Sequence, residues 1–197
     1  MTTQVTGSGV NFNGSTSGTI LLTQPAVAGS NTITLPAETG TARTTVSSGT
    51  VLQVVNYTTG AVATGTTAIP QDDTIPQITE GTQFMSLAIT PKSATSKLII
   101  QVVACLTSNV VDNICTALFQ DATANALAAL NSVNSAAGWM LNHSYVYYMT
   151  SGTTSSTTFR VRIGANGGTT ITFNGTAGGR LYGGVMPSSI TITEVVP

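Results

Sequence analysis

Apolar and polar residues alternate with a period of two along several stretches of this chain. In residues 159–163 (FRVRI) apolar side chains alternate with arginines, and in residues 170–173 (TITF) and 190–193 (ITIT) they alternate with threonines. Successive side chains of a β-strand point to opposite faces, so each stretch predicts a strand with one buried face and one exposed face. The pattern therefore predicts a β-rich protein.

One stretch has a different pattern. Residues 98–106 (LIIQVVACL) are almost all apolar, which predicts a central strand covered on both faces. Glycine-rich turns at 166–168, 174–175 and 178–179 separate the other strands. Many short strands at close spacing predict an all-β fold, and we expect a jelly-roll-like antiparallel β-sandwich, with other sandwiches and barrels as alternatives.

One segment could be read in two ways. Residues 121–130 (DATANALAAL) are rich in alanine and begin with an aspartate that could cap a helix. The same residues can form a loop between two strands. We favour the loop.

The N-terminal region has too few strands for a core of its own. It predicts two short strands, at 19–23 and 31–35, joined by a small-residue linker. A boundary near residues 44–50 divides the chain into an N-terminal β arm (1–49) and a β-sandwich knob (50–197). Such an arm needs a partner, and its apolar residues are the candidates for anchoring it: Val10, Phe12, Ile20, Leu21 and Leu22.

Composition argues against several classes of function. Only 7% of the residues are charged, against roughly 25% in ordinary soluble domains, and the chain has one histidine and two cysteines. Enzyme sites need clusters of such residues, so we expect no enzyme and no cofactor. No basic cluster favours nucleic acid, and no apolar run is long enough for a membrane helix or a secretory signal. The low charge favours self-association, with a monomer as the alternative.

Three carboxylates form the main candidate for a metal site. Asp72, Asp73 and Glu80 lie in a proline-containing loop. They lack the spacing of a calcium loop, so we interpret them as turn residues and predict no metal. Cys105 and Cys115 flank a predicted hairpin that would place them opposite each other. We expect free thiols, because directly opposed residues fit disulfide geometry poorly.

The segment 139–148 holds the main candidate for recognition. His143 next to Ser144 suggests a nucleophile and base, but no orienting carboxylate or nucleophile-elbow motif accompanies them, so we do not expect catalysis. Trp139, His143, Tyr145 and Tyr147 could instead form a patch that binds a glycan or a protein partner. Alternation places the last three on one strand face, and for most of these aromatic side chains we favour burial in a core or subunit interface over an exposed patch.

Four segments resemble a β module of bacteriophage virion surface proteins of the tail-fibre, head-fibre and capsid-decoration type. They are IPQDDTIPQITEGTQFMSLAITPKSATSKLII (69–100), ALFQDATANALAA (117–129), YYMTSGTTSSTTFRVRIG (147–164) and TITFNGTAGGRLYGGVMPSSITITEV (170–195). The N-terminal GTILLTQPAVAGSNTITLPAETGT (18–41) resembles a short segment common in phage structural proteins. The resemblance carries no catalytic motif. It does not extend to the two cysteines or to the GWMLNHSYV segment.

The resemblance implies a homotrimeric, non-enzymatic phage structural protein that is made in the host cytoplasm and located on the virion surface. We expect a capsid decoration or cement protein that docks by its arm on phage proteins, because the chain is short and has no shaft or coiled coil. The alternative is a short tail-fibre or head-fibre tip that binds a host surface glycan or protein.

Overall fold

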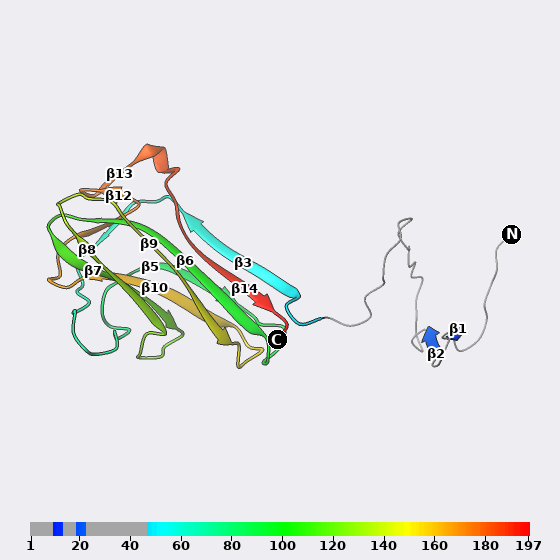
Figure 1. Ribbon diagram of the computed structural model, residues 1–197. Helices are drawn as coiled ribbons and strands as arrows, with labels where there is room; N and C mark the ends of the chain where they lie inside the picture. Colours follow the sequence, from blue (N-terminus) through cyan, green and yellow to red (C-terminus); the bar gives the residue numbers. More distant parts are fainter. Residues whose placement is uncertain (1–9, 14–18, 23–46) are drawn as a thin grey trace. The chain divides into compact units, whose positions relative to one another are not determined.

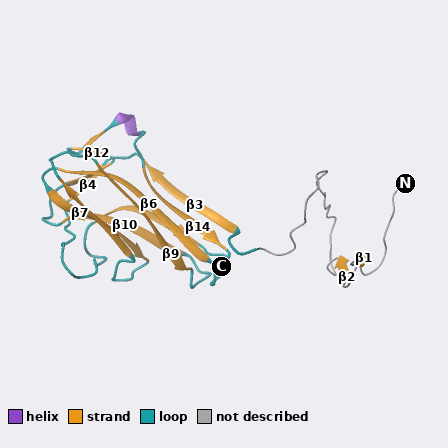
Figure 2. Cartoon of the chain, in the orientation of Figure 1, coloured by secondary structure: helices purple, strands orange, loops and turns teal. Residues whose placement is uncertain are grey.

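The computed structural model describes residues 10–13, 19–22 and 47–197, and its regular structure is almost entirely β (Figures 1 and 2). Contacts within the chain divide it into two units, Met1–Thr44 and Thr45–Pro197. We call the second unit the knob.

In the first unit the described residues form a hairpin. β1 (Val10–Asn13) pairs antiparallel with β2 (Thr19–Leu22), so that Val10 lies opposite Leu22 and Phe12 lies opposite Ile20. The strand predicted at 31–35 lies outside the described residues. All five residues predicted to anchor the arm therefore fall in one small hairpin.

The knob consists of antiparallel strands and one short helical turn. Its elements are β3 (Val51–Thr59), β4 (Ala63–Gly65), β5 (Thr82–Ile89), β6 (Lys97–Ser108), β7 (Asp112–Gln120), β8 (Ala128–Asn134), β9 (Leu141–Thr150), β10 (Thr157–Ala165), β11 (Ile171–Phe173), β12 (Gly175–Thr176), β13 (Gly179–Arg180), the 3-10 turn η1 (Tyr182–Gly184) and β14 (Ser188–Val195). Within the described ranges, nothing helical approaches the length and apolarity of a membrane span.

The long strands form two sheets that pack face to face. β3-β14-β6-β9 makes up the front sheet and β5-β10-β7-β8 the back sheet, while β11 and β4 extend the front sheet beside the end of β6. If the eight long strands are numbered in chain order, the front sheet has the order 1-8-3-6 and the back sheet 2-7-4-5. This is the strand order of a jelly roll, so the predicted fold class is confirmed.

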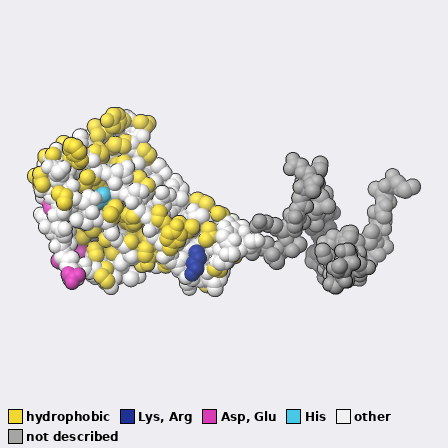
Figure 3. Space-filling model, viewed as in Figure 1, with side chains coloured by type: hydrophobic (Ala, Val, Ile, Leu, Met, Phe, Trp, Pro, Cys, Tyr) yellow, Lys and Arg dark blue, Asp and Glu magenta, His cyan; other side chains and the backbone are white. Residues whose placement is uncertain are grey.

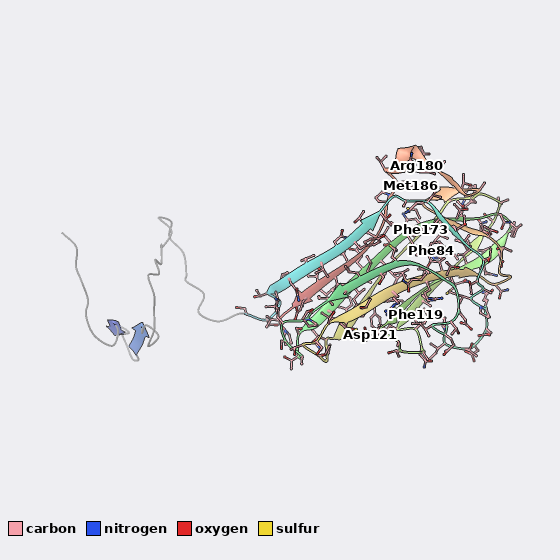
Figure 4. The ribbon with its side chains drawn as sticks, turned by 180° about the vertical axis from the view of Figure 1, so that it is seen from behind. Phe84, Phe119, Asp121, Phe173, Arg180 and Met186 are labelled. Carbon is pink, nitrogen blue, oxygen red and sulfur yellow. The ribbon has the colours of Figure 1, made fainter. Side chains whose placement is uncertain are left out.

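The core lies between the two sheets. Ile100 and Ile192 of the front sheet face Leu118, Phe159 and Val161 of the back sheet, and all five are buried. At one end, the rings of two phenylalanines, residues 84 and 173, stack with their centroids 5.0 Å apart (Figure 4). β10 and β14 thus bury the face that their period of two predicts, whereas the half-exposed strand predicted at 170–173 is wrong, because Thr172 of β11 is buried as well as Ile171 and Phe173.

The back sheet also buries part of its outer face. The loop between β4 and β5 lies over β7, where Ile69 packs with Cys115, Ala117 and Phe119 in a second apolar cluster. The guanidinium of Arg162 fixes this loop by donating to the backbone oxygens of residues 80 and 81, at 2.7 and 2.8 Å. Residues 114–119 are consequently buried on both strand faces, which the sequence pattern did not predict.

The strand predicted to be covered on both faces is covered over only part of its length. β6 alternates between buried and more exposed residues up to Val103, and every residue from Ala104 to Ser108 is buried. The segment after β11 covers this second half: the Thr107 hydroxyl donates to the Gly175 oxygen at 3.0 Å, and the Asn174 amide donates to the Cys105 oxygen at 2.9 Å.

Two further expectations concern the connections between strands. Residues 121–127 form a loop and β8 begins at Ala128, so the loop is confirmed and the helix is excluded. The predicted hairpin between Cys105 and Cys115 is wrong. β6 and β7 belong to different sheets, because the short connection at 109–111 crosses the sandwich. Both cysteines are free thiols, and burial raises the pKa of Cys115 to about 11.

Candidate interaction surfaces

The four residues predicted to form one recognition patch do not share a surface. Along β9 the burial alternates, so that His143, Tyr145 and Tyr147 face the core while Ser144 faces outward. Trp139 lies in the loop before β9 with 59% of its surface exposed. The alternation correctly grouped the three β9 side chains, but the order of the strands turns that face inward, so an exposed four-residue patch is wrong.

His143 is a core residue. It is 1% exposed, and its Nδ1 lies 2.8 Å from the Thr116 hydroxyl of the opposite sheet. Burial lowers the pKa of His143 to about 4, so the ring is neutral near pH ~7. His143 at this place is shielded from solvent and points away from the outward-facing Ser144, so these two residues do not form a base and nucleophile pair.

The loop carboxylates stabilise turns. Asp72 accepts hydrogen bonds from the hydroxyl and amide of Thr74, at 2.5 and 2.8 Å, and these bonds lower the pKa of Asp72. Glu80 accepts from the amide of Gln77 at 2.9 Å. A hollow of about 410 Å³ lies beside them, lined by residues 72–76 and 126–129. Across the described ranges, no three His, Cys, Asp or Glu side chains gather as metal ligands would.

The sequence pattern did not lead us to predict one buried carboxylate. Glu194 of β14 is fully buried and accepts hydrogen bonds from Ser96 Oγ (2.5 Å), Gln53 Nε2 (2.6 Å) and the amides of Lys92 and Ser93 (2.8 and 3.2 Å). Burial raises the pKa of Glu194, but these hydrogen bonds outweigh burial and hold it below its ordinary value. The period of two that buries Ile190 and Ile192 also points Glu194 inward, so the signal was present.

The outer face of the front sheet is exposed and almost free of charge. We call it the front face. Tyr148, Ile99, Thr193 and Val54 lie opposite one another in β9, β6, β14 and β3, and form a row across the sheet. Of this row, Tyr148 is 66% and Val54 is 56% exposed. Figure 3, in the orientation of Figure 1, shows mainly yellow and white side chains over these strands.

A hollow lies beside the row. It has a volume of about 460 Å³ and is lined by Lys97, Tyr148, Met149 and Thr150. The ammonium group of Lys97 donates to the Thr150 hydroxyl at 2.7 Å. A protruding ring and a recess therefore stand side by side at one edge of the front face.

Loops at one end of the sandwich carry a second group of exposed apolar side chains. Trp139 lies in the loop before β9, and Tyr182 and Val185, which are 75% and 81% exposed, lie in and after η1. The Gly138 amide donates to the Ser108 oxygen at 2.8 Å, which ties the Trp139 loop to the end of β6. Tyr182 has φ 47°, a left-handed conformation that is costly for a residue with a side chain.

No known family profile matches the chain, and no curated protein matches it. Among solved structures, it is similar to the Gt strain of infectious bursal disease virus (15% identity, TM-score 0.38, 91% of this chain and 47% of that one). It is also similar to the VP2 subviral particle of that virus (14% identity, TM-score 0.33, 90% of this chain and 48% of that one). The Gx strain of the virus gives a comparable match (18% identity, TM-score 0.34, 91% of this chain and 48% of that one). The chain spans about half the length of these viral capsid proteins, and at this identity the likeness concerns the β-rich fold alone.

Proposed function

We propose that this chain is a non-enzymatic structural protein of a bacteriophage particle. In this proposal it is a homotrimeric capsid decoration protein that docks through its N-terminal arm and projects the jelly-roll knob from the surface. The observation that carries the proposal is the division of the chain into a jelly-roll knob with its own core and a separate hairpin of two four-residue strands. A hairpin of this size is at best marginally stable in water and needs a partner to cover it.

Three further observations support the proposal. The segments at 69–100, 117–129, 147–164 and 170–195 resemble phage virion surface modules. The jelly roll is a fold that capsid domains use. The chain's only histidine is in the core, and the carboxylates of Asp72, Glu80 and Glu194 hold backbone amides, which leaves these groups a structural role.

The experiment locates the protein on the particle. Antibody labelling of intact phage is expected to mark the capsid, and labelling confined to the tail would contradict decoration. In a second step, particles stripped of the protein are mixed with the full chain. The variant Phe12→Lys is expected to lose co-sedimentation because a charge replaces one of the apolar residues predicted to anchor the arm, whereas Asn13→Lys, which puts the same charge at a polar position of the same strand, is the control. If both variants bind like the wild type, the arm is not the anchor.

A receptor-binding tip remains the second candidate, because the loops around Trp139 and Tyr182 expose aromatic rings that could bind a host glycan or protein. The double variant Trp139→Ala/Tyr182→Ala distinguishes the two functions. A tip protein would lose adsorption to host cells, whereas a decoration protein would leave the adsorption rate of the phage unchanged.

A further inference from the structure

We propose that the front face is the surface through which copies of this chain pack against one another. This inference deepens the self-association contained in the proposed function and rests on it. It assigns the contact to the row of Tyr148, Ile99, Thr193 and Val54 and to the hollow beside Tyr148.

The size of the face fits a subunit contact. Its outward-facing residues are Val51, Val54, Asn56, Thr58, Lys97, Ile99, Gln101, Val103, Asn142, Ser144, Val146, Tyr148, Thr150, Ser189, Thr191, Thr193 and Val195. These 17 residues are somewhat fewer than the about 20–30 that each partner contributes to a standard interface, so the face is large enough to supply most of one. Exposed apolar side chains are gathered in the part of the face nearest Tyr148, whereas Ser144 and Asn56 lie toward its other end.

The charge of the face selects a second copy as the occupant. Lys97 is the only Lys, Arg, His, Asp or Glu among the outward-facing residues, and it is the first residue of β6. The face carries no acidic side chain with which Lys97 of a second copy could pair, but the place of Lys97 at the first residue of β6 lets two copies meet over the rest of the face without burying an unpaired charge. A strongly charged partner would find no complementary group on this face.

The shape of the face points the same way. Tyr148 protrudes, with 66% of its surface exposed, directly beside a hollow that it helps to line. Aromatic side chains that fill a recess of the partner are the typical anchors of protein interfaces. A surface that carries both the protrusion and the recess can supply both halves of a contact between identical chains.

The outer face of the back sheet is covered in its middle, although β8 keeps exposed residues such as Val133 on that side. The β4–β5 loop covers β7 through Ile69, and Arg162 of β10 holds that loop. The front sheet has a comparable cover only over the second half of β6, where residues 174–175 pack. The front face is therefore the sheet surface of the described knob that is open across four neighbouring strands.

Lysine labelling of the full chain tests the proposal with an internal control. The chain has only two lysines, Lys97 on the front face and Lys92 in the loop before β6, and both are exposed. Acylation by an amine-reactive ester is followed by mass spectrometry over a dilution series, with light scattering in parallel. The expected result is that labelling of Lys97 falls as the protein associates, whereas labelling of Lys92 stays constant.

Charge substitutions provide the second arm. Tyr148→Lys is expected to raise the dissociation constant of the assembly by at least about tenfold, and Lys97 then stays reactive at concentrations where it is protected in the wild type. Tyr182→Lys, an equally exposed tyrosine at the loop end, is expected to behave as the wild type. Far-ultraviolet circular dichroism and an unfolding midpoint that match the wild type, both measured at a dilution at which both proteins are monomeric, show that Tyr148→Lys folds.

Four results would overturn the proposal. They are a wild-type mass of 20.0 kDa at every concentration, equal labelling of Lys97 in monomer and assembly, an assembly undisturbed by Tyr148→Lys, and protection of Lys97 even in the monomer. The last would mean that another segment of the same chain covers the face. Antibody labelling of the particle tests the proposed function separately, since a virion protein can associate through a different surface.

Discussion

The single histidine makes the stability of the knob depend on pH in a predictable direction. His143 is buried against Thr116, and burial lowers its pKa from 6.5 to about 4. In the unfolded chain the imidazole regains its ordinary pKa, so between these two values the unfolded state binds more protons than the folded state. The stabilising effect of the neutral ring is complete above the unfolded pKa and is lost as the pH falls toward the folded pKa.

The size of the effect follows from the two pKa values. A shift from 6.5 to about 4 corresponds to about 3 kcal/mol over the whole window. Between pH ~7.5 and pH ~5, integration gives a loss of about 2 kcal/mol in the free energy of unfolding. Most carboxylates remain ionised at pH ~5, so the histidine dominates this range.

Urea unfolding at these two pH values measures the loss, and NMR titration of the one imidazole measures the folded pKa directly. His143→Gln removes the titrating group while keeping a polar side chain near Thr116. This variant is expected to be less stable than the wild type at pH ~7.5, but its stability should change little on going to pH ~5. A folded-state pKa near 6.5, or the same pH dependence in His143→Gln as in the wild type, would refute the reasoning.

Three other predictions follow from buried groups. Glu194→Gln places an amide donor among four donors and is expected to destabilise the knob by about 3 kcal/mol in thermal unfolding, whereas the exposed Asp73→Asn should change the stability very little. Because the pKa of Glu194 is lowered in the folded protein, the stability that this carboxylate supplies is present above about pH 4.5 and is lost as the pH falls below that value. An equal effect of both variants would contradict the role of Glu194. Gly164→Ala is expected to lower the free energy of unfolding in urea by at least about 2 kcal/mol, because a Cβ at residue 164 would lie 2.6 Å from the Thr67 backbone oxygen. A variant as stable as the wild type would show that the β4–β5 loop is not packed against Gly164. The Cys115 thiol, with its pKa raised to about 11, is expected to react with iodoacetamide only on unfolding, and rapid alkylation of the native protein would disprove its burial.

The alternation of apolar and polar residues predicted most strands and their buried faces. It placed Phe159, Val161 and Ile163 in one buried row, and the structure confirms this. The same period grouped His143 with Tyr145 and Tyr147 and could have placed Glu194 inward. These features are local, because the geometry of one strand decides which side chains share a face.

The errors arose where the partner of a strand mattered. The two cysteines looked like the ends of a hairpin, because a short connection gives the same sequence pattern whether it joins neighbouring strands or crosses to the other sheet. The face of β9 that holds His143 looked suited to recognition, because alternation alone does not say which face meets the core. Long-range pairing, such as Tyr148 opposite Ile99, decides both questions.

The sequence by itself determined the β class, the strand faces, the weakly charged surface and the division into an arm and a knob, because each depends on composition or on neighbouring residues. Only the tertiary structure decided the jelly-roll strand order, the burial of His143 and Glu194, and the joining of residues from four strands into one weakly charged face. Strand pairing brings together segments as distant as Val54 and Thr193, and such proximity leaves no periodic trace in a single sequence.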